Sequence, residues 1–440
     1  MEQDNQRVSV RRDDARARAR RAAVAVLYSY SRVMVSINTA LLSAIVITLM
    51  PSDADRIVLA LTISTLISNC LASWKEQVIY RFHRMGVRKA LDRWTRGETI
   101  TLVIAAVLGS IVGGVWWMSP LTTAVTIALA VSDAGYRTAS AALQASGKDR
   151  AFIVLNVIKA ASEIGTVLAL LHMPLYILAA IAVCRGALWR VAASSAATSV
   201  PPEGDDGADW RQYALRIGIW LVLIQLLVYL PQLVMARAVQ ESGRQPVFAV
   251  YRLFSQSVLL ASGMAGIYVQ PKLLIVLHAQ GRESFHRAWR RVLPAYVLSV
   301  LAPVGAVAVA FPSAVRVFGE PAALEWALST PTAVGAACLA LANYVQRLVE
   351  VTHDLHLAVI PLAVATMSMG VCAMAASGGH SYAPHGVGFA FSGSLSLYLT
   401  LLCVGARSAK VAPPEIGRCL ALIAVIGVVL LGISVWGGLR

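Results

Sequence analysis

The chain has 440 residues, of which 58% are hydrophobic and only 14% are charged, and its mean hydropathy is +0.67. Soluble proteins carry about 25% charged residues, so this composition excludes an ordinary soluble domain and indicates a multi-pass membrane protein. The formal net charge of +15 does not indicate nucleic-acid binding, because that requires a basic face on a soluble domain. We expect no nucleic-acid partner and explain the charge by membrane topology.

A basic tail, residues 1–21, precedes a long apolar run. We interpret this run as a retained first span, because it is longer than a signal-peptide core and lacks a convincing cleavage site. Segments long enough to cross about 30 Å of hydrocarbon recur to the end of the chain. The predicted spans are 22–50, 54–80, 99–118, 120–143, 151–171, 174–197, 213–236, 247–276, 292–311, 327–348, 356–377 and 385–405, with a thirteenth left open at 417–436.

Basic residues gather in connections that fall on one side of the membrane when the spans are counted. Because basic loops stay in the cytoplasm and acidic residues count little, we predict that the N-terminus is cytoplasmic. Two connections on the same side, 199–210 and 349–354, are acidic instead. The basic segments are the tail, 81–98, 147–150, 278–291 and 406–418.

A short internal repeat indicates how the spans are grouped. The stretch "HRMGVRKALDRWTR" from residue 83 aligns without gaps with "HAQGRESFHRAWRR" from residue 278, with four identities. The alternative is two independent amphipathic basic loops. The repeat predicts an all-α polytopic fold of two parallel six-helix halves around a central cavity. The halves are residues 22–197 and 213–405, joined by a cytoplasmic linker at 198–212.

Several charged side chains fall inside the predicted spans, where each costs at least about 2.5 kcal/mol and so needs a partner or a wet cavity. Asp133 with Arg137, and Lys159 with Glu163, stand at helical i, i+4 spacing and can pair locally. The alternative is that Asp133 or Glu163 binds a coupling proton or sodium ion.

Three further arginines, Arg32, Arg185 and Arg252, have no acid at helical spacing. An acid on another helix could pair with each of them. Unpaired arginines exceed unpaired acids within the spans, which favours a cationic cavity that binds an anion. The planar arginine fork suits phosphate. The six cysteines have no metal-binding or disulfide spacing, and there is no nucleotide-binding loop, so we expect no metal and no cofactor.

Four stretches resemble known lipid flippases. "YSRVMVSINTALL" from residue 30 resembles the first helix of the lipid II flippases, and "VYRLFSQSV" from residue 250 resembles their eighth helix. "YVQPKLLIVLHAQGR" from residue 268 and "VRVFGEPAALEWAL" from residue 315 resemble the polysaccharide flippases. Both groups belong to the multidrug/oligosaccharidyl-lipid/polysaccharide exporter superfamily. By span order the resemblance covers nearly the whole chain.

This resemblance implies a substrate site. In that family, cations on the first and eighth helices line a central cavity and engage the pyrophosphate of a polyprenyl-linked sugar, a role that would fall to Arg32 and Arg252. Asn38 stands where the lipid II flippases have a second arginine, and Lys75 is the nearest cation to their second-helix arginine. These departures favour a lipid-linked glycan other than the peptidoglycan precursor. We add Arg185 to the candidate substrate-binding residues.

The expected function is flipping of a polyprenyl-diphosphate-linked oligosaccharide across a bacterial inner membrane. The expected partners are the lipid-linked glycan, membrane lipid, and a polysaccharide polymerase with its export machinery. One alternative is an ion-coupled drug exporter, which needs acids in its cavity. Another is a polyprenyl-dependent glycosyltransferase or ligase, but no outer connection carries an obvious catalytic set. We therefore expect a transporter and not an enzyme.

Overall fold

The computed structural model describes residues 41–82, 119–197, 209–242, 283–294, 356–377 and 383–409, with shorter pieces between them. The tail, the predicted spans 22–50, 99–118, 247–276, 292–311, 327–348 and 417–436, and Arg32 lie wholly or mostly outside the described residues. The shorter pieces are residues 38, 252, 276, 280, 281, 334, 335, 337–339, 341, 342, 344–346, 349, 417 and 425.

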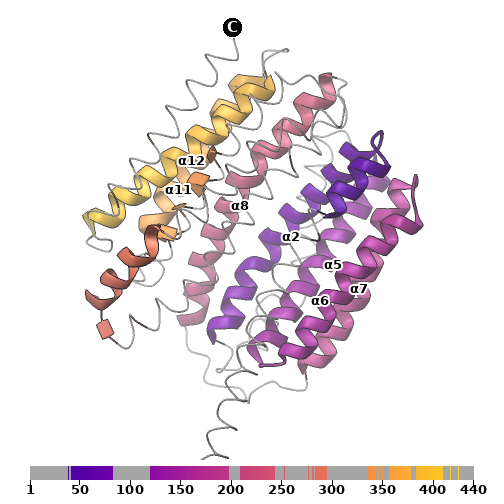
Figure 1. Cartoon of the computed structure of the whole chain (residues 1–440), viewed down its shortest axis with the longest axis horizontal. Helices are drawn as coiled ribbons and strands as arrows, with labels where there is room; N and C mark the ends of the chain where they lie inside the picture. Colours follow the sequence, from indigo (N-terminus) through magenta and orange to yellow (C-terminus); the bar gives the residue numbers. More distant parts are fainter. Residues whose placement is uncertain are drawn as a thin grey trace, which may run out of the picture.

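Seven long helices make up most of the described structure, and each covers a predicted span (Figure 1). Within the described residues the regular structure is entirely helical. The helices are α2 (Ala54–Phe82), α5 (Pro120–Ala145), α6 (Asp149–Ala169), α7 (Pro174–Ala197), α8 (Asp209–Ser242), α11 (His356–Ser377) and α12 (Ala383–Ser408).

Prolines set where two of these helices begin. Pro120 and Pro174 are the first residues of α5 and α7, where the missing N–H of proline costs no intrahelical bond. The hydroxyl of Ser119 caps α5 by accepting a hydrogen bond from the Thr122 N–H at 3.2 Å. After α5, Gly147 reverses the chain with a φ of +71°, a conformation that glycine adopts without steric cost. The helices α5, α6 and α7 therefore follow one another through short turns.

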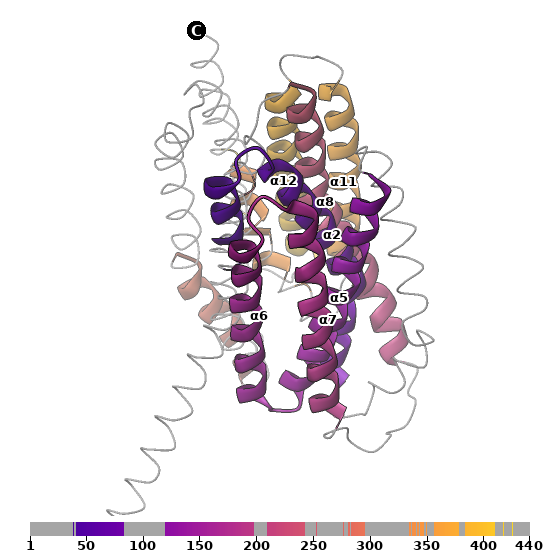
Figure 2. The same cartoon turned by 90° about the vertical axis from the view of Figure 1, so that its right-hand side faces the viewer.

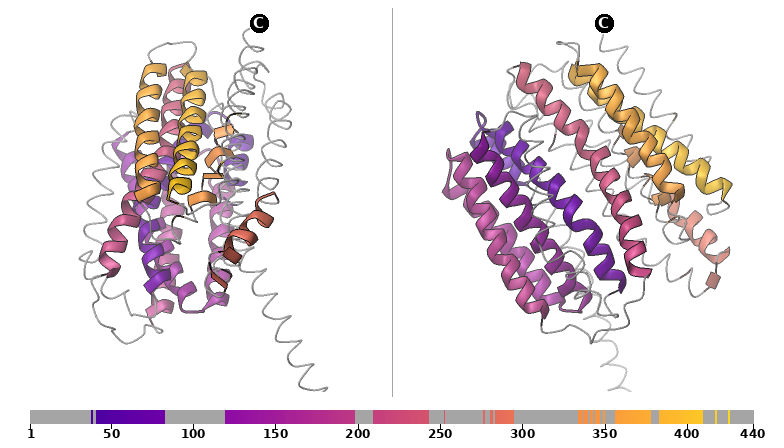
Figure 3. Two further views of the ribbon diagram at one scale, coloured as in Figure 1. Left: turned by 90° about the vertical axis from the view of Figure 1, so that its left-hand side faces the viewer. Right: turned by 180° about the vertical axis from the view of Figure 1, so that it is seen from behind.

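The described helices form two groups, which meet where α2 lies beside α8. Helices α2, α5, α6 and α7 pack together on one side, with α6 and α7 side by side (Figures 1 and 2), and α8, α11 and α12 pack on the other. From behind, α8 lies between α2 and the pair α11 and α12 (Figure 3). The bounds of the two predicted halves stay a prediction, because many of their spans lie outside the described residues.

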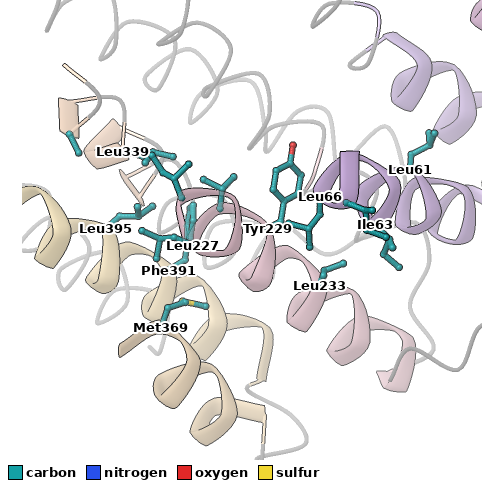
Figure 4. Close-up of a cluster of buried hydrophobic side chains, with 14 of the residues drawn as sticks. Leu61, Ile63, Leu66, Leu227, Tyr229, Leu233, Leu339, Met369, Phe391 and Leu395 are labelled. Atoms are coloured by element: carbon teal, nitrogen blue, oxygen red, sulfur yellow. The ribbon is translucent and has the colours of Figure 1, made fainter. Parts of the chain in front are cut away.

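One apolar core runs through both groups. Figure 4 shows Leu66 of α2 beside Tyr229 of α8, and Leu227 of α8 beside Phe391 of α12. Packing is closest between α5 and α7, where a Cβ added to Gly135 would lie 2.4 Å from ring carbons of Trp189. Gly135 therefore lets a bulky indole lie directly against the α5 backbone.

The outer faces of these helices are apolar, whereas several charges are buried between them. Tyr176, Val183, Ile360 and Met367 are among the most exposed large side chains. Five helices of the described part are long and apolar enough to cross a bilayer, namely those within 54–79, 149–169, 174–196, 210–234 and 388–408. Apolar outer faces, with a few charged side chains buried between the helices, are typical of a multi-pass membrane protein.

Candidate functional site

Asp133 of α5 is the centre of a buried set of hydrogen bonds between four helices. Its Oδ1 lies 2.8 Å from Nζ of Lys159 on α6 and 3.1 Å from NH1 of Arg185 on α7. Its Oδ2 accepts a hydrogen bond of 2.7 Å from the Ser68 hydroxyl on α2. Lys159 Nζ also lies 4.9 Å from the ring centroid of Tyr136. The carboxylate therefore joins α2, α5, α6 and α7.

Glu163 of α6 completes this set. Its Oε1 lies 2.6 Å from Nε of Arg185, and its Oε2 accepts a hydrogen bond of 2.7 Å from Nδ2 of Asn38. The side chains of Arg185 and Glu163 are only 11% and 2% exposed. We call Asp133, Lys159, Glu163 and Arg185 the closed network, because two acids and two bases neutralise one another in a nearly inaccessible place.

The i, i+4 spacing of these charges in the sequence is compatible with ion pairs within a single helix. The four ion pairs seen between described residues, however, each join different helices. Residues four apart lie on one face of a helix, and that face points at the neighbouring helix, where the opposite charge comes closer. Arg185 thus has two acidic partners on other helices. The role of Asp133 or Glu163 in binding a coupling ion stays a prediction.

Arg137, one turn from Asp133, belongs to a second polar group. Its guanidinium forms a bidentate pair with Glu76 of α2, with Nε 2.7 Å from Oε1 and NH2 3.2 Å from Oε2. NH2 also donates to the hydroxyl of Ser73 at 3.1 Å, and NH1 donates to Oδ1 of Asn69. The side chains of Arg137 and Glu76 are 25% and 18% exposed, so this pair is more accessible than the closed network.

Asn69 carries the second group across to α8. Its Nδ2 donates to Oε1 of Gln225 at 2.8 Å and to the hydroxyl of Tyr229 at 3.4 Å. We call the six residues of this group the seam, because they join α2 and α5 to α8 inside the bundle. The seam consists of Asn69, Ser73, Glu76, Arg137, Gln225 and Tyr229.

The other predicted cations lie along α2. Arg252 is fully buried, and its NH1 donates to the carbonyl oxygen of Val58 at 2.7 Å. Lys75 is half-buried, with its Nζ 5.7 Å from the ring centroid of Trp74. The hydroxyl of Tyr229, a seam residue, is close enough to the guanidinium groups of Arg252 and Arg137 to interact with their charges. Arg32 lies outside the described residues, so its place beside Arg252 stays a prediction.

The structure thus groups the predicted residues in an unexpected way. Asn38 and Arg185, both expected to bind substrate, meet at Glu163 in the closed network. Sequence reasoning missed the uncharged members of the seam, although a signal was present in α2. Asn69, Ser73 and Glu76 stand at i, i+4 and i+7, a polar stripe on one face of an apolar helix. Within the described residues no cluster of side chains could hold a metal ion.

Neither a family model nor a curated protein matches the sequence. Solved structures do. The lipid II flippase MurJ, in an inward closed conformation, superposes with a TM-score of 0.63 at 12% identity, over 94% of this chain and 96% of that chain. The fold of this chain is therefore similar to that of this flippase. An outward-facing multidrug resistance transporter of the MATE family superposes with a TM-score of 0.57 at 14% identity, over 88% and 96%.

A third MOP structure matches over almost the whole chain. It is a MOP superfamily transporter from Pyrococcus furiosus, whose binding pocket is described as having reverse polarity, with a TM-score of 0.56 at 13% identity over 95% and 96%. These structures are similar to this chain in fold, and identities this low show nothing beyond the fold. They confirm the predicted class, an all-helical multi-span membrane protein, while the number of spans stays a prediction.

Proposed function

We propose that this protein flips a polyprenyl-diphosphate-linked oligosaccharide, an O-antigen, capsule or exopolysaccharide repeat unit, from the cytoplasmic to the outer leaflet by alternating access. The solved structures with its fold include a lipid II flippase and multidrug transporters, so the fold leaves the substrate open. The charges inside the helix bundle favour the anionic lipid.

The observation that carries this proposal is that both acids of the closed network are already paired with basic side chains. Asp133 and Glu163 each lie within 3.1 Å of a basic side chain. A cationic drug or a sodium ion would have to displace Lys159 or Arg185, which are tethered to the same bundle. In this conformation Asp133 and Glu163 are therefore poor sites for a cation.

A negatively charged ligand would find a more suitable partner in the same bundle. Arg252 donates to a backbone carbonyl, a neutral acceptor that a diphosphate oxygen could replace with a charged and stronger one. With Arg32 on the first span, Arg252 would hold the diphosphate while the prenyl chain stays in lipid. Lys75, half-buried on α2, would add to the positive potential around the diphosphate. After flipping, the polysaccharide polymerase would receive the repeat unit.

A reconstituted transport assay separates the two candidate substrates. Proteoliposomes with purified protein would be tested with a fluorescent polyprenyl-diphosphate oligosaccharide, scored by loss of accessibility to a membrane-impermeant reagent, and in parallel with a cationic dye under a proton or sodium gradient. We expect movement of the lipid and no accumulation of the dye. Gradient-driven dye accumulation without lipid movement would instead establish a drug exporter.

A further inference from the structure

Two polar groups lie inside the described bundle, and they differ in accessibility. In the closed network every charged side chain is at most 11% exposed. In the seam, Arg137 and Glu76 are 25% and 18% exposed, and Asn69 and Gln225 are also only partly buried. The closed network fits a structural role, whereas a ligand entering between the helix groups could reach the seam.

The chemistry of the seam does not suit a phosphate. A diphosphate accepts hydrogen bonds only, and the Glu76 carboxylate beside Arg137 would repel it. The seam offers donors and acceptors in equal measure, since it contains a guanidinium, a carboxylate, two amides, a serine hydroxyl and a phenol. Planar groups that carry a donor next to an acceptor, such as the amides of Asn69 and Gln225, match the neighbouring hydroxyls of a sugar, each of which donates and accepts.

We propose that the seam, through Asn69, Glu76, Arg137, Gln225 and Tyr229, is a glycan-binding subsite that holds a sugar of the lipid-linked substrate. This inference rests on the proposed function and adds a second contact region to the diphosphate site. The seam residues satisfy one another when no ligand is bound. A sugar hydroxyl that takes the place of Gln225 on Asn69 exchanges one neutral hydrogen bond for another at small net cost.

The position of the seam fits a ligand that also reaches Arg252. Val58, whose carbonyl binds Arg252, and Asn69 are eleven residues apart on α2, or about 16 Å along the axis. Tyr229 lies within electrostatic range of Arg252 and of Arg137. An extended ligand could therefore place its diphosphate at one end of this stretch and a sugar at the other.

A binding experiment that varies only the sugar tests the subsite. The purified full-length protein in nanodiscs would be titrated with undecaprenyl diphosphate, and with undecaprenyl diphosphates that carry one glucose, galactose or N-acetylglucosamine. We expect at least one glycosylated lipid to bind wild type about tenfold more tightly than the sugar-free lipid. Gln225→Ala and Tyr229→Phe should reduce that advantage to about twofold and leave binding of the sugar-free lipid unchanged, because each removes about one hydrogen bond to the sugar.

Gln232→Ala is the matched control. Gln232 lies on the same helix, is buried, and donates to the Val228 carbonyl of its own helix at 3.2 Å, so its loss should leave the sugar-dependent advantage intact. Tyr229→Phe removes a single oxygen and keeps the ring packing, so it remains informative if Gln225→Ala unfolds.

The possible outcomes are distinct. Equal binding of all four lipids by wild type would overturn the subsite and leave the proposed function standing. Equal weakening of all four lipids by Gln225→Ala and Tyr229→Phe, with a lower unfolding temperature, would also overturn it and make the seam a helix-to-helix contact only. Binding of none of the lipids by wild type would overturn the proposed function and the subsite together.

Discussion

Arg185 on α7 and Glu163 on α6 form an ion pair of 2.6 Å between Nε and Oε1, buried from water and lipid. The same guanidinium reaches Asp133 of α5 at 3.1 Å, so a single side chain connects three helices. From the sequence, Arg185 is expected to bind an anionic ligand. In this conformation it is instead paired with two acidic side chains. Any anionic substrate of this protein therefore competes with them for Arg185 or binds elsewhere.

The closed network should behave as one unit in stability measurements. Glu163→Gln removes one acid and leaves Arg185 with only Asp133, and breaking a buried pair in this way costs about 3–5 kcal/mol. The double variant Glu163→Gln with Arg185→Gln should recover much of the loss, because no uncompensated charge remains. Thermal unfolding in detergent measures both. A double variant less stable than Glu163→Gln alone would show that the pair does not act as a unit.

The same double variant tests ion coupling. If Glu163 serves only to hold helices together, restoring stability should restore transport of the lipid-linked glycan to near the wild-type rate. If Glu163 binds a coupling ion, or if Arg185 binds the substrate, the double variant should fold normally and stay inactive. Lys159→Met with Asp133→Leu provides the parallel test on the other pair of the network.

Arg32 should be essential for export, because we expect it to hold the diphosphate with Arg252. Arg32→Lys keeps the charge but loses the bidentate fork and should retain partial export, whereas Arg32→Ala and Arg32→Glu should abolish it. Export would be scored in a flippase-deleted strain beside the amount of protein in the membrane. Normal export by Arg32→Ala, or a loss that follows the protein level, would remove Arg32 from the substrate site.

The predicted topology can be tested with single cysteines in a variant that lacks the native ones. Cysteines at Arg93 and Arg287 should react with an impermeant maleimide only after the cytoplasmic side is opened, and one at Gly378 should react from outside. Arg287 is exposed in the structure, which makes its labelling informative. Labelling of Arg93 and Arg287 from opposite sides would contradict the parallel repeat.

Any side chain at Gly135 should lower the stability of the folded protein. A Cβ at this position would lie 2.4 Å from the Trp189 ring, so Gly135→Ala should force α5 and α7 apart at a cost of about 1–3 kcal/mol. Gly165→Ala is the control, since nothing lies within 4 Å of a Cβ added there, and we expect it to be neutral or slightly stabilising. The unfolding temperature should therefore fall for Gly135→Ala and stay the same or rise for Gly165→Ala, and equal shifts would refute the close packing.

The spans were predictable because lipid leaves the backbone few choices. An apolar stretch of sufficient length has to be a helix, and the prolines at 120 and 174 determine where α5 and α7 begin. The partners of the interior charges were not predictable. Spacing shows that Lys159 and Glu163 share a helix face but not which helix faces them, and that depends on how α5, α6 and α7 pack. The amides of Asn69 and Gln225 were missed because an uncharged polar residue stands out little in a membrane span.

The short turns between α5, α6 and α7 have a consequence for how the protein enters the membrane. Each of these helices carries charges that are costly in lipid. The partners of Asp133 in the folded protein, Lys159 and Arg185, follow it by 26 and 52 residues. The three helices are consecutive, with connections of a few residues. The insertion machinery would therefore retain α5 until α6 and α7 emerge from the ribosome, and release all three into lipid as an assembled three-helix unit.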